Sequence, residues 1–590
     1  MSAVITSRTW DLTPIFPSVE SKEFQAAVES CKKNLAKLEA DLNGSPAEFT
    51  QRFSGILESV NNLGEELGLV RAYLYMVTTT DTRHAAGKKA QSEFTFVVQD
   101  FQKAMKTLCA AIGNANPDDL INQTPYTKDH EFHIRQMHTL ASRQMSPAEE
   151  ALASDLAASG EIAWGRLHST GSSQLKVTVE LPTGPEVMSM SKARTLAYDP
   201  DREVRKAGYE AELRAWKESE EVFAATLNGI KGASVVVCAK RGWKSPLEEA
   251  LFSENLDEVT LESMMTAAKE SFPTLRRYFK AKARYLGTKQ LAFFDIFAPV
   301  GSESRTWDYE DGEKIVEKSF DSYSKKMGDL ARMSRNERWV DVDPRDGKVD
   351  GAYCIEAGGP KSRILLNFKP AFGSVSVHAH ELGHAYHNLC LDGRTYLQKQ
   401  ETPSSLAETA SIFCETILQA DALNELSGDD QLPIIEASLQ RAGQVVVDIT
   451  SRFLFEKTVM ERRVKSELSP SELCEIMLWA QDETYGDGLD PELRHPYMWA
   501  AKPHYYRPGN NFYNFPYMFG MLFALGLYRV YKEEGNSFLP RYDKLLSSTG
   551  MQNASTLAKE FGIEIRTPEF WRGSLAVITE DVERFEKLVP

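Results

Sequence analysis

Apolar residues recur every three or four positions over most of the chain, with polar residues between them, which is the spacing of amphipathic helices. Five stretches show this pattern with few helix breakers: residues 22–42, 54–78, 88–113, 146–160 and about 200–230. The fourth stretch begins with Ser146, Pro147 and Glu149, a combination typical of the first turn of a helix. We therefore expect a mainly α-helical protein.

A smaller part of the chain has the composition of strands. Residues 175–191 alternate between apolar and polar, turn at Pro182–Pro185 and alternate again, which predicts a hairpin. Three shorter strand-like segments precede a histidine-rich stretch: residues 291–300, 351–355 and 363–368. These segments predict a small β-sheet beside a helix that carries the histidines.

The length of 590 residues exceeds what one hydrophobic core usually supports, so two or more lobes are expected. A long charged helix begins after the hairpin, and we place a boundary near it. The expected division is an N-terminal helical lobe over residues 1–190 and a catalytic region over residues 191–590. The first 175 residues contain no chemical motif.

Composition narrows the classes of partner. The formal net charge is −16, which argues against a nucleic acid or an anionic membrane as the main partner. No apolar run reaches the length of a membrane span, and the first residues lack the basic and apolar segments of a secretory signal. The seven cysteines are scattered and form no C-x-x-C pair, which is typical of reduced thiols in a cytoplasmic protein.

The stretch "HAHELGHAYH", residues 378–387, contains the motif H-E-x-x-H. On a helix, His380 and His384 share one face about 6 Å apart along the axis, so both can bind one zinc ion. Glu381 points away from that site by about 100° and can reach a zinc-bound water as a general base. The alternative is a buried core helix whose histidines bond to backbone or carboxylates. His378 and His387 are expected to be structural or supporting residues.

Two histidines leave a tetrahedral zinc site short of one protein ligand. A second expected helix, which begins near Thr402 and Pro403, offers carboxylates at Glu408 and Glu415 on a largely apolar face. We expect Glu408 to be the ligand and Glu415 to accept a hydrogen bond from a ligand histidine. Glu401 precedes the helix and is expected to be solvated. The alternative for this face is an ordinary salt-bridged helix, and the nearby cysteines, Cys354, Cys390 and Cys414, are expected to be packing residues.

Together these segments resemble the thimet-oligopeptidase family of zinc peptidases, in particular its oligoendopeptidase F branch. The resemblance covers roughly residues 175–580 and rests on "HELGHAYH" with "LAETASIF", on "GKVDGAYC" with "RILLNF", on "DPDREVRKAGYEA" and on "HYYRPGNNFYNFPYMFG". It implies a mainly helical fold in which two lobes flank a deep substrate channel, with the zinc helix on its floor. The N-terminal lobe is then expected to form a channel wall.

The resemblance also implies roles for individual residues. The zinc ligands are His380, His384 and Glu408, and the general base is Glu381. An edge strand at Gly351, Ala352 and Tyr353 would bind an extended peptide through its backbone. His504, Tyr513 and Tyr517 would bond the substrate and the developing oxyanion, with Tyr505 or Tyr506 as competing assignments. Gly509, Asn510 and Asn511 would make this loop mobile enough to close over a peptide.

The resulting hypothesis is a cytoplasmic zinc endopeptidase that cleaves internal bonds of oligopeptides, using one zinc ion per chain. One alternative is a zinc carboxypeptidase, in which Arg507 could hold a free C-terminus. The other is a peptide-binding scaffold without activity, although such a protein would have no use for Glu381.

Overall fold

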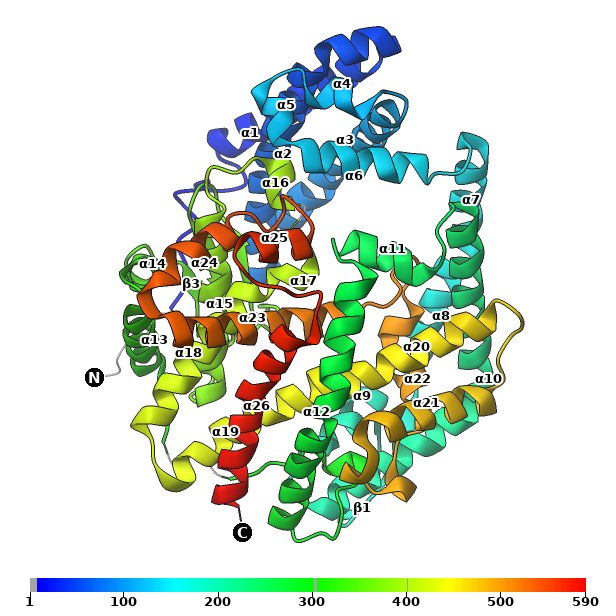
Figure 1. Ribbon diagram of the computed structural model, residues 1–590, viewed down its shortest axis with the longest axis vertical. Helices are drawn as coiled ribbons and strands as arrows, with labels where there is room; N and C mark the ends of the chain where they lie inside the picture. The colour runs from blue at the N-terminus through cyan, green and yellow to red at the C-terminus, as the bar shows by residue number, and fades with distance from the viewer. Residues whose placement is uncertain (1–7, 302–304, 401, 590) are drawn as a thin grey trace. The chain divides into compact units, whose positions relative to one another are not determined.

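The structure is a computed structural model that describes residues 8–301, 305–400 and 402–589. Most of the described residues lie in helices, and the named strands form only two small sheets (Figure 1). This arrangement confirms the expected mainly α-helical class.

The chain divides into two compact units, each assembled from three segments of sequence. Unit 1 contains Met1–Arg143, Arg305–Ala422 and Val530–Phe561. Unit 2 contains Gln144–Ser304, Leu423–Arg529 and Gly562–Pro590. This division differs from the boundary expected near residue 190, because the chain returns to each unit after leaving it. A single position in the sequence cannot separate two cores that are built in this way.

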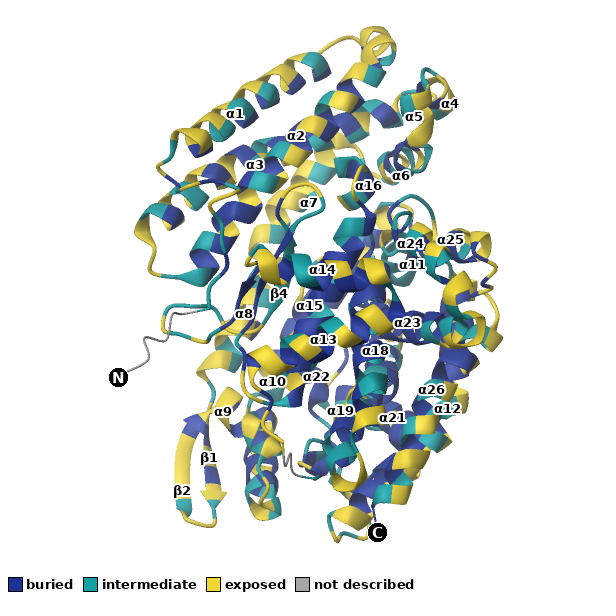
Figure 2. Cartoon of the chain, turned by 90° about the vertical axis from the view of Figure 1, so that its left-hand side faces the viewer, coloured by how far each residue is buried: buried dark blue, intermediate teal, exposed yellow. Residues whose placement is uncertain are grey.

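The N-terminal part of unit 1 is helical, as the apolar spacing predicted. The long helices are α1 (Lys22–Leu42), α2 (Pro46–Thr80), α3 (Ala85–Gly113) and α6 (Glu131–Ser142). Their apolar faces share one buried core, and the exposed face of each helix alternates with its buried face in Figure 2. At the start of α2, the Ser45 side chain accepts from the Glu48 N–H, while the Glu48 carboxylate accepts from the Ser45 N–H.

A three-stranded sheet in unit 1 lies against the histidine helix. The strands are β3 (Val340–Asp341), β4 (Tyr353–Glu356) and β5 (Ser362–Leu365), in the order β3-β5-β4. β4 is an edge strand and runs antiparallel to β5, with Tyr353 opposite Leu365. The histidine helix is α15 (Phe372–Cys390), which contacts both β4 and β5. The expected sheet beside this helix is therefore present.

One of the expected strands is wrong. Residues 291–300 form a single bridge, between Leu291 and Leu489, and then the short 3-10 helix η2 (Phe293–Asp295). Both faces of this segment are largely buried, so its apolar residues do not need the alternation of a half-exposed strand. The other helices of ten or more residues wholly within unit 1 are α13 (Tyr309–Tyr323) and α14 (Lys325–Asn336).

Unit 2 is built around the 39-residue helix α10 (Arg202–Lys240). The predicted hairpin is confirmed by β1 (Lys176–Leu181) and β2 (Gly184–Ser189), which pair antiparallel. The other helices of ten or more residues wholly within unit 2 are α7 (Pro147–Ser159), α8 (Glu161–Gln174), α12 (Glu258–Tyr285), α19 (Leu432–Ala442), α20 (Ile449–Arg463), α21 (Pro470–Tyr485) and α26 (Pro568–Leu588). Two helices continue from one unit into the other, α18 (Thr409–Glu425) and α23 (Phe515–Glu534).

Among the described helices, α10 alone has the length and apolar composition that would permit a membrane crossing. Half of its apolar window, 50%, is buried inside the protein. It also contributes several buried residues to the core of unit 2. This burial accounts for α10 as a core helix, and it lies where the sequence predicts a long helix over about residues 200–230.

Candidate metal centre and peptide groove

The two motif histidines lie one turn apart on α15 and point their Nε2 atoms at the same place. The α15 residues Val375, Ala379, Leu382 and Tyr386 are buried on several sides of the helix. Their packing fixes the orientation of the helix in unit 1. The His380 and His384 Nε2 atoms are 3.2 Å apart. Two imidazoles in this arrangement direct two lone pairs toward a single point.

Glu408, the expected third ligand, completes the cluster from a break between two helices that the sequence did not predict. We expected one helix beginning near Thr402, but the chain forms the short α17 (Ser404–Ala407), breaks at Glu408 and resumes as α18. Glu408 Oε2 lies 3.3 Å from His380 Nε2 and 3.6 Å from His384 Nε2. Zinc bonds of about 2.0–2.1 Å in tetrahedral geometry place the ligand atoms about 3.3–3.4 Å apart, so these three side chains fit a zinc ion.

A glycine allows the two ligand-bearing segments to approach. A Cβ atom at Gly383 would lie 2.5 Å from Ser411 Cα and 2.6 Å from the Ala410 carbonyl oxygen. A side chain at this position would therefore push α15 away from the start of α18. The glycine of the motif H-E-L-G-H is what brings Glu408 within reach of the two histidines.

The electrostatics favour metal binding at neutral pH. Burial opposes ionisation of Glu408, but hydrogen bonds and charges from His380, His384 and Ser411 lower its pKa to about 2. The Ser411 hydroxyl donates to Glu408 Oε2 at 2.8 Å. Burial lowers the pKa of His384 to about 4, so its imidazole is neutral and its lone pair is available.

Glu415 fixes the orientation and tautomer of His380. Glu415 Oε1 lies 2.6 Å from His380 Nδ1. An ionised carboxylate can only accept, so the proton of the neutral imidazole resides on Nδ1 and the Nε2 lone pair faces Glu408 and His384. Glu415 therefore lies where the expected hydrogen-bond acceptor should be.

The other histidines of the stretch have structural surroundings. His387 Nε2 lies 2.9 Å from the Thr549 hydroxyl and 3.2 Å from the Leu546 carbonyl, which joins α15 to residues 546–549. His378 is buried beside the ring of Tyr309. In the described chain, the cluster of potential metal ligands contains His380, His384 and Glu408. Glu401 lies outside the described residues.

Glu381 lies beside the cluster in a nearly dry environment, with 6% of its surface exposed. Burial raises the pKa of Glu381 to about 7, and the charge of Glu408 adds to this effect, while His380 and the backbone N–H of Cys354 oppose it. The Cys354 N–H belongs to β4, so the edge strand contributes to the electrostatic environment of this carboxylate. A carboxylate whose pKa is close to neutral pH is suited to accept and return a proton. A bound dication would lower this pKa.

A cavity of about 900 Å³ within unit 1 opens onto these residues. One wall is β4, and the opposite wall is the face of α2 formed by Gly64, Gly68, Leu69, Ala72 and Tyr75. His380, Glu381, His384 and Glu408 also line it. We refer to this cavity as the groove. Its walls are an exposed strand edge and a helix face that combines small residues with the charged residues Glu65, Glu66 and Arg71.

The register of β4 determines which backbone groups face the groove. The Ala357 N–H donates to the Lys361 carbonyl, so antiparallel alternation makes Ile355 and Tyr353 the residues that bond to β5. Cys354 then points its N–H and C=O away from β5, in agreement with its bond to Glu381. By the same alternation, Ala352 and Glu356 face the groove.

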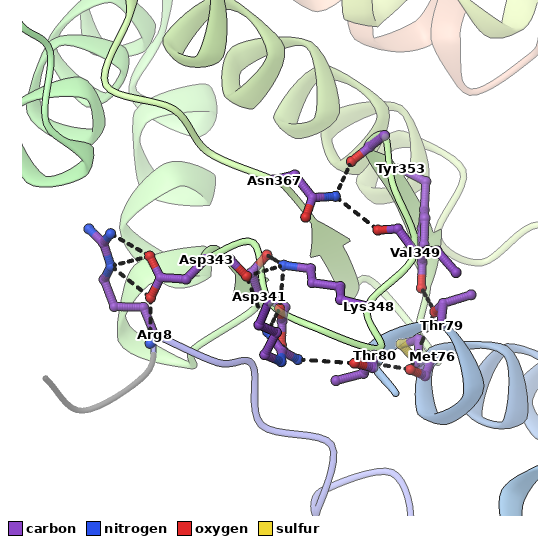
Figure 3. A network of polar contacts seen from close by, with 12 residues as sticks. Arg8, Met76, Thr79, Thr80, Asp341, Asp343, Lys348, Val349, Tyr353 and Asn367 are labelled. Carbon is purple, nitrogen blue, oxygen red and sulfur yellow. Dashed lines mark hydrogen bonds and ion pairs between the residues drawn. The ribbon is translucent and has the colours of Figure 1, made fainter. Parts of the chain in front are cut away.

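Gly351 differs from expectation because its polar backbone groups are already used. Its N–H donates to Asp350 Oδ1 at 2.9 Å, and its carbonyl accepts from Asn367 Nδ2 at 2.9 Å. Asn367 also donates to the Val349 carbonyl (Figure 3). The Tyr353 hydroxyl lies 2.6 Å from the Thr79 hydroxyl. The segment is a fixed turn before the strand and not part of its pairing edge.

A buried ion pair anchors the same turn. Lys348 Nζ lies 2.6 Å from Asp341 Oδ1, and both side chains are fully buried. The ammonium also donates to the Asp341 and Asp343 carbonyls, so all of its protons are used (Figure 3). The entrance to β4 is therefore rigid.

The predicted residues of the C-terminal segment lie together in unit 2. The rings of His504 and Tyr513 stack 5.2 Å apart, and the hydroxyls of Tyr513 and Tyr517 are 2.6 Å apart. Tyr517 is 42% exposed. Burial and the nearby cations Arg452, Arg507 and Lys502 lower the pKa of His504 to about 4, so its imidazole is neutral. In contrast, Tyr505 and Tyr506 are buried in the core, which disfavours them as substrate-binding groups.

Two buried cations hold the loop that carries Tyr513. Lys231 of α10 lies 2.6 Å from Glu456 of α20 and donates to Asn511 Oδ1 at 3.1 Å. Arg452, paired with Asp448, lies 3.4 Å from Asn514 Oδ1. Asp448 ends a π-helical turn, Gly443–Asp448, of the kind found often at functional sites. These contacts restrict the loop mobility that Gly509, Asn510 and Asn511 had suggested.

The model of peptidase family M3 matches residues 195–577 of this chain, and that of oligopeptidase F matches residues 110–176. The chain belongs to peptidase family M3. The boundary between the two matches falls close to the expected boundary near residue 190, even though the compact units are interleaved.

Curated relatives and solved structures agree with this membership. The M3 peptidase is 24% identical to oligopeptidase PepF of Bacillus subtilis, over 100% of this chain and 88% of that protein. It is 23% identical to an oligoendopeptidase F homolog of Lactococcus lactis, over 98% and 97% of the two chains. Its fold is similar to a putative peptidase from Chlamydophila abortus (TM-score 0.84, 20% identity, covering 99% and 98%). It is also similar to oligoendopeptidase-F from Enterococcus faecium (TM-score 0.69, 17% identity, covering 96% and 99%).

The sequence did not single out the supporting residues Lys231, Arg452 and Asn367 of this M3 peptidase. One signal for Lys231 was present, because it is a lone charge within the apolar run "TLNGIKGASVVV". A single charge within an apolar helix face predicts a buried partner, but it does not say which carboxylate that partner is.

Proposed function

We propose that this M3 peptidase is a zinc-dependent endopeptidase that cleaves internal bonds of oligopeptides. The observation that carries the proposal is the spacing of His380, His384 and Glu408, whose ligand atoms lie within 4.8 Å of one another. Zinc held there would act as a Lewis acid, polarising a peptide carbonyl and lowering the pKa of a water molecule. The peptide substrates are proposed from the names of the curated relatives.

Glu381 would transfer the proton in the reaction. It accepts a proton from the attacking water and delivers it to the nitrogen of the departing amine. Its burial next to the proposed ligands supports this role, because burial raises the pKa of the carboxyl group to about 7.

The substrate would bind as an additional strand along β4. The register supports pairing at Ala352, at the Cys354 carbonyl and at Glu356, and it moves the proposed contacts away from Gly351 and Tyr353. The absence of a side chain at Gly68 on the opposite wall, where a Cβ would meet no atom within 4 Å, leaves space for a peptide backbone.

His504, Tyr513 and Tyr517 are proposed to donate hydrogen bonds to the substrate and to the developing oxyanion. The neutral state of His504, the exposure of Tyr517 and the contact between the two phenols support donor roles. We also propose a cytoplasmic location, because all seven cysteines are free thiols.

The test compares the wild type with Glu381→Gln on an internally quenched peptide of about ten residues whose two ends are blocked. We expect the variant to retain zinc, measured by elemental analysis, and to lose at least about 100-fold in kcat because the proton acceptor is removed. Glu262→Gln, an exposed position in unit 2, is the matched control and should behave as the wild type.

Unchanged turnover in Glu381→Gln would overturn the assigned base. The blocked ends also test the carboxypeptidase alternative, in which Arg507 would hold a free C-terminus. Arg507 stacks over Tyr513, 4.6 Å from the ring centroid. If the enzyme cleaves only peptides with a free carboxylate, the alternative is correct.

A further inference from the structure

A second cavity lies wholly within unit 2 and has no part in the proposed reaction. Its volume is about 510 Å³, within the range of small-molecule sites. It lies between α8, α10, the short helices α9 (Met190–Thr195) and α22 (Met498–Ala501), and the segment that leads to His504. Six aromatic side chains contribute to its walls: Tyr198, Tyr209, Trp216, Phe293, Phe294 and Phe297.

The acidic groups at this cavity already have basic partners. Glu212 lies 3.1 Å from Arg194 and 3.4 Å from His495 Nε2, and it accepts from the Trp216 N–H at 3.0 Å. Burial opposes the ionisation of Glu212, but His495 and Arg194 lower its pKa to about 2. The carboxylate is therefore ionised, and its basic partners balance its charge. The Asp295 carboxylate, which does not line the cavity, pairs with both Arg202 and the lining residue Arg205. The carboxylates therefore have no capacity left for a cationic ligand.

One cation at the cavity has no acceptor, and one ring nitrogen there has no hydrogen-bond partner. Among the residues that the structure describes, no carboxylate or carbonyl accepts from the Lys502 ammonium, which lines the cavity. The imidazole of His495 is 1% exposed, also lines the cavity, and its Nδ1 has no hydrogen-bond partner. A half-buried cation without a counter-charge is costly, and a bound anion would remove that cost.

We propose that this cavity binds a small organic carboxylate with an aromatic or apolar body, and that Lys502 is the counter-ion of the carboxylate. The aromatic walls account for the apolar body and the ammonium accounts for the anion. The proposal does not depend on zinc binding or on peptide hydrolysis.

Binding should take up protons near neutral pH. Burial lowers the pKa of Lys502 to about 7, and the cations Arg452 and Arg194 add to this effect, while Asp448 and Glu212 oppose it. Near pH 7, about half of the free protein then carries a neutral Lys502. A bound carboxylate favours the ammonium and raises this pKa, so affinity should be higher at pH 6 than at pH 8.5.

The experiment is isothermal titration calorimetry on the zinc-loaded full-length enzyme with N-acetyl-L-phenylalanine as the probe. The matched neutral probe is N-acetyl-L-phenylalaninamide, which has the same aromatic body and no carboxylate. We expect the acid to bind at least about 10-fold more tightly than the amide, as for a charge-assisted hydrogen bond. Its apparent enthalpy should change with the ionisation enthalpy of the buffer, because protons are taken up.

The protein variants place the probe at the cavity. Lys502→Met should weaken binding of the acid by at least about 10-fold, Lys502→Arg should retain it, and Lys465→Met, an exposed lysine of unit 2, should have no effect. Because Lys502→Met removes an unpaired half-buried charge, its Tm should not fall, which is measured in parallel. A carboxylate that bound instead at the zinc centre would bind Lys502→Met and Lys465→Met equally.

Three results would overturn the proposal: equal affinity for acid and amide, undiminished binding to Lys502→Met, or no dependence of the enthalpy on the buffer. The Glu381→Gln assay tests the proposed function separately, so failure of one experiment leaves the other intact.

Discussion

The candidate metal centre of unit 1 and the loop of unit 2 that carries His504 and Tyr513 are positioned in different ways. The centre is formed by residues between 380 and 415, and helical spacing with one glycine brings them together. The loop is also short, but it is held by Lys231, 280 positions away from Asn511. Residues that bind a metal are recognisable as a pattern, whereas residues that hold a loop are distant and have no fixed spacing.

The backbone conformations also differ. The proposed metal ligands lie in helices or at a helix end with ordinary dihedral angles. The loop contains Phe512 at φ 56°, in the left-handed region that non-glycine residues seldom adopt. The ring of Phe512 is buried against Phe453. The loop therefore needs its anchors to retain a costly conformation, while the helices of the metal centre do not.

The largest expected effect comes from removing an anchor of the loop. Lys231→Met leaves Glu456 buried without its cation, which should reduce the free energy of unfolding by about 3–5 kcal/mol in a urea titration. Lys457→Met changes an exposed lysine on the same helix as Glu456 and should have little effect.

The double variant Lys231→Met with Glu456→Met separates stability from loop position. Replacing both charges should restore much of the lost stability, because no unpaired charge remains. Turnover should stay reduced, since Asn511 still lacks its donor. A double variant with full activity would show that the ion pair stabilises unit 2 without positioning the loop.

The next effect tests the close packing in the metal centre. Gly383→Ala forces α15 and the start of α18 apart and should cost about 1–3 kcal/mol of stability. Zinc affinity, measured by competition with a chelator, should fall as well, because Glu408 moves away from the histidines. Gly373→Ala on the same helix is the control, since its Cβ meets no atom within 4 Å. Equal zinc affinity in both variants would contradict the role given to Gly383.

The smallest effect concerns the orientation of His380. Glu415→Gln keeps an oxygen that can accept from Nδ1 but removes the charge, so zinc affinity should fall about 10–100-fold with little loss of stability. Glu425→Gln, near the exposed end of the same helix, should leave zinc affinity unchanged. An unaltered affinity in Glu415→Gln would limit Glu415 to a packing role.

Much of the fold was predictable wherever one face of a helix is buried. The helix over residues 22–42 and the hairpin near residues 175–191 follow from periodicity and turn residues. The strand predicted over residues 291–300 is wrong, because a segment buried on both sides shows no apolar periodicity that identifies its secondary structure. The interleaving of the two units could not be predicted, since it depends on which distant segments share a core.

The candidate site divides in the same way. His380, His384 and Glu381 follow from one motif, and Glu408 was selected as the nearby carboxylate on an apolar face. The break in the helix at Glu408 could not be predicted, because it depends on how closely Gly383 lets α18 approach. The use of the Gly351 carbonyl by Asn367 is likewise a tertiary contact.

The N–H and carbonyl of Gly351 already have hydrogen-bond partners, and this limits how long a peptide can be and still gain hydrogen bonds from β4. In the proposed binding mode, pairing of a peptide with β4 begins at Ala352 and ends after Glu356, because the Ala357 N–H donates to the Lys361 carbonyl. The edge of β4 that is available for pairing is thus about five residues, or roughly 17 Å, long. A peptide shorter than this edge would leave some backbone groups of β4 without hydrogen bonds. Peptide residues beyond either end of the edge would form no further hydrogen bonds with it. In a series of peptides of increasing length, the gain in kcat/KM from backbone pairing should level off once the peptide spans the whole pairing edge.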